Sequence, residues 1–320
     1  MMSVVIEKEK EYVTHAPPPI HSIITILLLI VFVIACLPEA KELDEDATIE
    51  TFMSRAFPSM ISLQTLIYTR ILFSTFIFLI TIVSVLPGQG WDQITSYLPG
   101  SKLRRTSIRL EGLRTMMPFT SWSWNLLGVS FSLNAWIAYQ AGVLQRQDYV
   151  PPSLLRMALL LYAVAAPSTL LVSFVVTYAI WPNLLRQKVS TKNIKSTRTL
   201  IWHNANVMMA LAESFLLGGI PVRIRYIAVA PMLGILYVLF TWYRMNSWKP
   251  TEGPQFIYFF FDTTLGIKTT LALLMLLLVM MMFYTIFAMA HSLLPLLGGS
   301  LVFHVLFVIT VCTVVCRFKD

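Results

Sequence analysis

Eight hydrophobic stretches divide this chain, and Lys and Arg lie mostly in alternate loops between them. A helix needs about 20 mostly apolar residues to cross the hydrocarbon core of a bilayer. Most of the stretches are long enough, whereas the first and the sixth are short. The last two form an apolar hairpin, 269–316, in which only His291 and Ser292 mark a break. The pattern predicts helices at roughly 20–37, 61–86, 117–143, 154–181, 200–219, 226–242, 269–290 and 294–316.

The composition indicates that lipid is the main solvent of the chain. Hydrophobic residues make up 57% of the sequence and charged residues 12%, whereas a soluble domain has about 45–50% and about 25%. The net charge of +8 comes from basic residues in short loops between apolar stretches. We therefore expect anionic lipid headgroups as their partners and no nucleic acid. No zinc-finger spacing or glycine-rich phosphate loop is present, and we expect neither a metal nor a cofactor.

The distribution of Lys and Arg predicts the orientation in the membrane. We name the side of the N-terminus side A and the opposite side side B. Of the 24 Lys and Arg residues, 17 fall on side A and 6 on side B, and Arg70 lies within a stretch. Cytosolic loops carry the excess of Lys and Arg. The predicted fold is therefore an all-α integral membrane protein, a bundle of about eight transmembrane helices with both termini cytosolic.

The loops are too short for a second domain. The longest are 38–60, which is acidic, and 87–116, which is rich in Gly, Pro and Arg. We expect a single transmembrane domain at 20–316, flanked by cytosolic tails at 1–19 and 317–320. The three cysteines, Cys36, Cys312 and Cys316, all lie in apolar stretches, which favours packing over a disulfide framework or a metal site.

A cluster of hydroxyl residues at the start of the third span is the first candidate for chemistry. It contains Thr115, Thr120, Ser121 and Ser123, in LRTMMPFTSWSWNLL. The fifth span also enters from side A, and His203 lies near its start, so Thr120 and His203 are predicted at similar depth. A hydroxyl becomes a useful nucleophile when an adjacent base takes its proton, and histidine suits that role. Capping by the Thr and a carbonyl contact by the His would be the non-catalytic interpretation.

Other polar residues within the spans have structural explanations. Glu213 lies ten residues beyond His203, about 15 Å along a helix, toward side B. Arg70 descends from side B to a similar depth, and a buried carboxylate needs a partner, so we predict an Arg70–Glu213 ion pair. His304 is isolated in an apolar stretch, where a hydrogen bond to a backbone carbonyl or a Ser is expected. Most tryptophans fall near span ends, as in an interfacial belt, and Trp122 and Trp124 flank Thr120.

These residues resemble a known family. FTSWSWNLL with Thr120 and WHNANVMMALAE with His203 and Glu213 are similar to two motifs of the androgen-induced / androgen-dependent TFPI-regulating protein family, which are multi-pass membrane threonine hydrolases. The separation of 83 positions between Thr120 and His203 also looks like that of the family. The segment Gly253–Asp262, GPQFIYFFFD, is similar to a third, looser motif. The resemblance covers roughly 60–290, so the first and last spans would be additions.

The resemblance implies a lipid ester hydrolase that cleaves fatty acid esters of hydroxy fatty acids. Thr120 would be the nucleophile, with Thr115 as a competitor, and His203 would be the base. Backbone N–H groups at the start of the third span, or the Asn204 amide, would stabilise the oxyanion. Partners would be membrane lipids and the ester, in the endoplasmic reticulum or plasma membrane.

Two non-enzymatic interpretations of the sequence remain open. An assembly subunit of a membrane complex would dock partner proteins through its terminal helices. A transporter would show a cavity near the membrane midplane around Arg70 and Glu213. Convergence of Thr120 and His203 in one pocket would favour the hydrolase.

Overall fold

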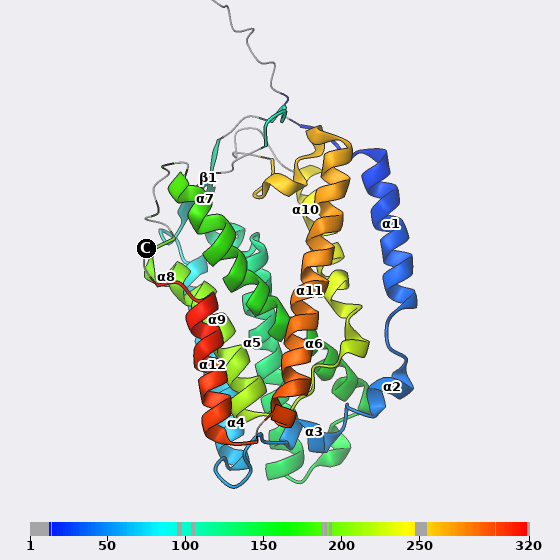
Figure 1. Ribbon diagram of the computed structural model, residues 1–320, viewed down its shortest axis with the longest axis vertical. Helices are drawn as coiled ribbons and strands as arrows, with labels where there is room; N and C mark the ends of the chain where they lie inside the picture. The colour runs from blue at the N-terminus through cyan, green and yellow to red at the C-terminus, as the bar shows by residue number, and fades with distance from the viewer. Residues whose placement is uncertain are drawn as a thin grey trace, which may run out of the picture.

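The computed structural model describes residues 13, 15–94, 98–103, 106–186, 188, 191, 194–246, 255–297 and 299–318. Within these residues the protein is a bundle of helices that run mostly along its long axis (Figure 1). The all-α prediction is confirmed. The described residues contain two strands, β1 (Trp91–Ile94) and β2 (Ser107–Leu110), which pair antiparallel as one hairpin. This hairpin lies in the loop 87–116, for which no regular structure was predicted.

Helices cover every predicted stretch. Among the described residues, four helices are long and apolar enough to cross a membrane: Leu63–Val85, Pro152–Arg186, Ile224–Met245 and Ile267–Leu297. Ile20–Ala35 and Leu301–Val315 are apolar but shorter. The α-helices are α1 (Ile20–Ala35), α2 (Ala40–Asp44), α3 (Ile49–Met53), α4 (Leu63–Val85), α5 (Phe119–Ala138), α6 (Pro152–Val175), α7 (Trp181–Arg186), α8 (Thr197–Leu200), α9 (Asn206–Ala212), α10 (Val229–Asn246), α11 (Ile267–Leu297) and α12 (Leu301–Val315).

The predicted break at His291 and Ser292 is wrong. Helix α11 continues through both residues and through Pro295 to Leu297, and the next helix is capped by Ser300, whose hydroxyl accepts from the Phe303 N–H. Ser292 does not interrupt the helix, because its hydroxyl donates to the carbonyl of Ala288 one turn back, at 2.9 Å. Hydroxyl back-bonding of this kind satisfies a polar side chain within an apolar helix.

Several helices contain π-helical turns, each of which inserts one residue into the regular hydrogen-bond ladder. One such turn, Val176–Ile180, joins α6 to α7. Two more interrupt the segment Thr197–Leu217, at Ile201–Ala205 and at Glu213–Leu217. The turns therefore fall at His203 and Glu213, the histidine and the carboxylate of that segment.

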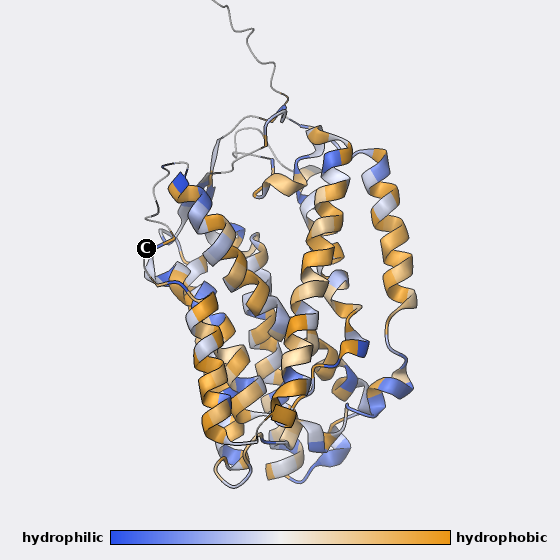
Figure 2. Ribbon diagram, in the orientation of Figure 1, coloured by the Kyte–Doolittle hydropathy of each residue, from blue (hydrophilic) through white to orange (hydrophobic). Residues whose placement is uncertain are grey.

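Helix α6 forms the centre of the bundle. Its alanines, Ala158, Ala163, Ala165 and Ala166, are all fully buried, and small residues of this kind let neighbouring backbones approach closely. The outer helices expose apolar side chains instead, and Figure 2 shows apolar residues along the helices with hydrophilic residues gathered mainly at the two ends. On α1, for example, Leu28 is 66% exposed. Outward apolar faces of this kind suit a bundle surrounded by lipid.

The two ends of the bundle are closed differently. The β-hairpin and the start of α8 lie at the side A end, whereas α2 and α3 cover the side B end (Figure 1). Of the predicted tails, residues 1–12, 14, 319 and 320 lie outside the described part of the chain.

Candidate functional site

Thr120 and His203 lie next to each other near the side A end of the bundle. Thr120 is the second residue of α5, which begins directly after Pro118. His203 lies in the π-helical turn Ile201–Ala205 between α8 and α9. The Thr120 Oγ1 atom is 3.5 Å from His203 Nε2, a loose contact of the kind seen in catalytic pairs without substrate. The predicted juxtaposition is therefore present, and the catalytic role of the pair stays a prediction.

Two contacts hold His203, one through its imidazole and one through its backbone. Its Nδ1 atom lies 2.8 Å from the carbonyl oxygen of Thr199. Because a carbonyl only accepts, Nδ1 carries the proton, and in the neutral ring Nε2 then presents a lone pair to Thr120. The hydroxyl of Ser173, on α6, donates a hydrogen bond to the backbone carbonyl of His203. The ring is thus held in the tautomer that can accept the Thr120 proton.

A cavity of about 200 Å³ lies beside this pair. Apolar residues of the π-helical turn Val176–Ile180 and of α7 form one wall, and strand β1 and the start of α8 supply polar groups. A pocket with an apolar wall and a few convergent polar groups is typical of a site for a small, largely apolar ligand. The lining residues are Trp91, Asp92, Gln93, Pro118, Thr120, Val176, Ile180, Leu184, Ile194, Arg198, Thr199, Trp202, His203 and Tyr258.

Strand β1 is fastened over the cavity by aromatic contacts. The Arg198 guanidinium lies 4.4 Å from the ring centroid of Trp91, a cation–π contact, and donates a hydrogen bond to the Gln89 carbonyl. Trp91 meets Trp202 edge to face, with ring centroids 5.8 Å apart. The hairpin and the start of the fifth predicted span therefore form one side of the site together.

Tyr258 reaches the cavity from the segment between α10 and α11. Its ring stacks on Phe260, with centroids 5.1 Å apart and planes 7° from parallel. Its hydroxyl faces the backbone of Phe119 and the hydroxyls of Thr120 and Tyr237. Burial raises the pKa of Tyr258 to about 12, and the interactions with these three groups, which lower the pKa, do not outweigh it. The phenol is therefore protonated at neutral pH.

The other hydroxyls of the cluster point elsewhere. Thr115 is fully buried in the 3-10 turn Gly112–Met116, and its Oγ1 donates to the Gly112 carbonyl at 2.7 Å. The Ser121 hydroxyl donates to the Thr115 carbonyl at 2.7 Å. Ser123 accepts a hydrogen bond from the Asn206 amide, 3.4 Å away. Thr120 is thus the member of the cluster that faces His203.

Asn204 does not provide the oxyanion contact expected of it. Its Nδ2 donates to the Arg317 carbonyl at 2.9 Å, and its Oδ1 accepts from the Arg317 N–H at 3.2 Å. The amide is occupied in holding the end of α12 against the fifth predicted span.

Trp124 does not belong to an interfacial belt. It is fully buried, and its indole Nε1 donates to the Ile77 carbonyl at 3.1 Å. Trp122, its neighbour in the motif, packs on Tyr237 and Phe240 with ring centroids 5.3 and 5.0 Å away. These rings fill the contacts of α5 with α4 and α10.

The predicted Arg70–Glu213 ion pair is confirmed. Arg70 Nε and Nη2 lie 2.9 and 2.6 Å from Glu213 Oε1, and the side chains are 0% and 1% exposed. Arg70 Nη1 also donates to the carbonyls of Phe52, at 2.6 Å, and Asn134, at 3.4 Å. His304 likewise bonds a backbone carbonyl, that of Phe215, at 2.7 Å from its Nδ1. Arg70, Oε1 of Glu213 and Nδ1 of His304 thus have their partners within the protein, whereas Oε2 of Glu213 is buried without a hydrogen-bond partner.

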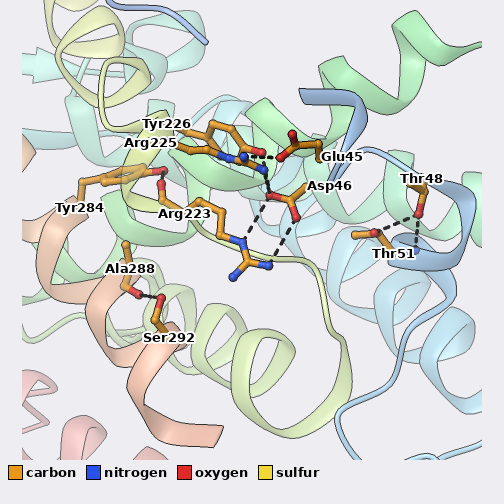
Figure 3. A network of polar contacts seen from close by, with 10 residues as sticks. All are labelled: Glu45, Asp46, Thr48, Thr51, Arg223, Arg225, Tyr226, Tyr284, Ala288 and Ser292. Atoms are coloured by element: carbon orange, nitrogen blue, oxygen red, sulfur yellow. Dashed lines mark hydrogen bonds and ion pairs between the residues drawn. The ribbon is translucent and has the colours of Figure 1, made fainter. Parts of the chain in front are cut away.

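A second polar network lies at the side B end (Figure 3). Asp46 accepts hydrogen bonds from Arg225 at 2.7 Å, Tyr226 at 2.7 Å, and Arg223 at 3.3 and 3.4 Å. Arg225 also binds Glu45, at 2.5 Å. Burial raises the pKa of Asp46, but these hydrogen bonds outweigh it and hold the pKa below its ordinary value. The network ties the acidic loop 38–60 to the segment before α10.

No protein-family model, curated protein or solved structure matches this chain. The geometry of the site therefore carries the functional argument. The residues that sequence reasoning missed are Arg198, Tyr258 and the β1 side chains, which reach the site from loops and segment ends without a periodic pattern. The described residues contain no group of three or more His, Cys, Asp or Glu placed to hold a metal ion.

Proposed function

We propose that this protein is a membrane-embedded lipid ester hydrolase with Thr120 as nucleophile and His203 as base. Its substrates would be fatty acid esters such as those of hydroxy fatty acids, as in the family that the motifs resemble. The observation that carries the proposal is the Thr120–His203 contact of 3.5 Å beside a cavity of about 200 Å³. The tautomer set by Thr199 gives this contact the direction that base catalysis needs.

The reaction would proceed by two acyl transfers. His203 Nε2 takes the Thr120 proton while Oγ1 attacks the ester carbonyl carbon. The tetrahedral intermediate collapses, the ester C–O bond breaks, and the imidazolium returns its proton to the departing alkoxide. A water molecule, deprotonated by His203, then attacks the acyl-threonine, and the Thr120 oxygen leaves and is reprotonated. The products are an alcohol, here a hydroxy fatty acid, and a free fatty acid.

The start of α5 supplies a donor for the oxyanion. The first N–H groups of a helix have no acceptor within the helix. Thr120 stands in this first turn, directly after Pro118 and Phe119. Its own N–H, adjacent to its nucleophilic oxygen, is the backbone donor that we assign. The positive end of the helix dipole adds to the stabilisation of negative charge.

We further propose that the bundle crosses the membrane eight times with both termini cytosolic. The charge asymmetry between sides A and B supports this orientation. On side B, moreover, Arg156, Arg223 and Arg225 are engaged by Asp44, Asp46 and Glu45. In this arrangement the site lies close to the cytosolic interface, where ester tails stay in lipid and water arrives from the cytosol.

The two alternative functions, a transporter and an assembly subunit, receive less support. For a transporter, Arg70 and Glu213 would line a path, but both side chains are buried and bound to each other. An assembly subunit would expose apolar faces on α1 and α12, and both helices do so; Val302 of α12 is 68% exposed. Helix α4 exposes similar residues, including Leu72 at 65%, so lipid contact accounts for all three.

The proposal is tested by fluorophosphonate labelling of the detergent-solubilised protein. We expect the wild type and Thr115→Ala to be labelled. We expect Thr120→Ala and His203→Ala to lose the labelling. Thr115→Ala is the matched control, because it removes a hydroxyl of the same cluster that bonds to Gly112. A folded wild type that takes no label, or a Thr120→Ala variant that still does, contradicts the proposal. A positive result leads to hydrolysis assays with hydroxy fatty acid esters.

A further inference from the structure

We propose that Tyr258 is a third catalytic residue, whose phenol donates a hydrogen bond to the oxyanion formed when Thr120 attacks the ester. This inference rests on the proposed hydrolase function and adds to it a residue outside the Thr and His motifs. Tyr258 belongs to the stretch 255–266, which directly precedes α11 and contributes to the wall of the cavity.

The directions of the hydrogen bonds leave one role for the phenol. The His203 Nδ1 proton is directed to the Thr199 carbonyl, so Nε2 accepts from the Thr120 hydroxyl. The Thr120 oxygen then has its lone pairs free, and Tyr258 lines the same cavity as Thr120 and His203. The nearby Tyr237 hydroxyl is itself donated to the Met117 carbonyl at 2.8 Å. Tyr258 is therefore the phenol available to donate toward Thr120.

A donor at the nucleophilic oxygen is also well placed for the oxyanion. On attack, the Thr120 oxygen and the former carbonyl oxygen become bonded to the same carbon atom. A small turn of the phenolic O–H then moves its hydrogen bond from one oxygen to the other. Tyrosine hydroxyls act as oxyanion donors where they are preorganised. Here the stacking of the ring on Phe260 and the contact of the hydroxyl with the Phe119 backbone supply that preorganisation.

The neutral state of the phenol matters for this role. A donor must carry its proton throughout the working pH range, and burial keeps that proton on Tyr258. With the Thr120 backbone N–H on the other side, the oxyanion would receive two hydrogen bonds. Two donors are the usual complement of an oxyanion hole in acyl transfer.

The first test compares Tyr258→Phe with the wild type in fluorophosphonate labelling rate and in ester turnover. The variant keeps the ring and its stacking and removes only the hydroxyl. We expect labelling and kcat to fall about 100-fold, the typical loss for one oxyanion donor, with little change in KM. Tyr243→Phe, on an exposed tyrosine of α10, is the matched control and should behave as wild type. Unchanged kcat in a folded Tyr258→Phe protein overturns the proposal for Tyr258 while leaving Thr120 and His203 in place.

A second measurement covers the case in which Tyr258→Phe does not fold. Incorporation of 3,5-difluorotyrosine at position 258 keeps the shape of the residue but makes the phenol more acidic. If the phenol is an essential donor, activity should be lost at the pH where the fluorinated phenol ionises. That pH should be lower than the pH of any alkaline loss of activity in the wild type. An unchanged pH profile contradicts the donor role. Absence of labelling in the wild type itself would overturn the hydrolase function and this inference together.

Discussion

Replacing Glu213 by Gln tests how strongly the buried ion pair stabilises the bundle. The change keeps the shape of the side chain and an oxygen facing Arg70, and it removes the negative charge. Arg70 retains its carbonyl acceptors on Phe52 and Asn134, but its charge is left uncompensated in a fully buried position. Removing one partner of a buried pair costs about 3–5 kcal/mol, and attraction between unit charges 4 Å apart is about 4 kcal/mol at an effective dielectric constant of 20.

Because the amide oxygen of Gln still accepts from Arg70, we place the loss near the lower end, at about 3 kcal/mol. Glu213→Ala, which removes every acceptor atom of the side chain, should reach about 5 kcal/mol. The free energy of unfolding can be measured by denaturant titration of the protein in mixed micelles. Replacing both residues by apolar ones, Arg70→Met with Glu213→Leu, should recover most of the loss, because no unpaired charge remains.

Glu50→Gln is the control, since this carboxylate on α3 is exposed and its change should stay within about 0.5 kcal/mol. The reasoning fails if Glu213→Gln and Glu50→Gln destabilise the protein equally. It also fails if the double variant is less stable than Glu213→Gln, because the pair would then be worth more than an apolar replacement.

Three further predictions concern other parts of the bundle. In Gly218→Ala the new Cβ would lie 3.0 Å from Arg70 Nη2 and against the Glu213 carboxylate, so the unfolding midpoint should fall by several degrees in a thermal scan. The folded-state pKa of Asp46 lies below its ordinary 3.8. The ionised carboxylate therefore stabilises the fold above pH 3.8, and this stabilisation is lost as the pH falls through the lower, folded-state pKa. When the free energy of unfolding is measured against pH, Asp46→Asn should not show this acid loss. Asn204→Ala removes both hydrogen bonds to Arg317, so amide hydrogen exchange should rise at the end of α12 and stay unchanged in α4.

The costs of burying polar groups made much of the structure predictable. An ionisable side chain in a membrane span needs a partner, and that rule identified Arg70 with Glu213 and a carbonyl acceptor for His304. Depth along the spans placed Thr120 with His203, because both spans enter from side A. Each of these predictions used a strong local penalty together with the near-straight path of a helix.

The remaining features depend on contacts that carry no such penalty. His291 and Ser292 resemble a turn in sequence, but helix backbone satisfies the serine hydroxyl, so polarity alone misplaced the end of α11. Thr115 and Thr120 look equivalent as hydroxyls five positions apart, and only the 3-10 turn before Pro118 turns Thr115 toward Gly112. Tyr258 approaches the site from a loop, whose path follows from tertiary packing.

The fifth predicted span carries the ion-paired Glu213 near one end and the proposed base, His203, near the other. Glu213 anchors its side B end to α4 through Arg70, and Ser173 of α6 holds the backbone of its side A end at His203. Each anchor coincides with a π-helical turn. If the anchors act separately, Glu213→Gln should lower stability without changing the labelling rate of the folded fraction. Ser173→Ala should slow labelling with a smaller loss of stability, because it loosens the base itself. An equal effect of both variants on labelling would mean that the ion pair also sets the depth of His203, and the segment would then act as one rigid support for the catalytic pair.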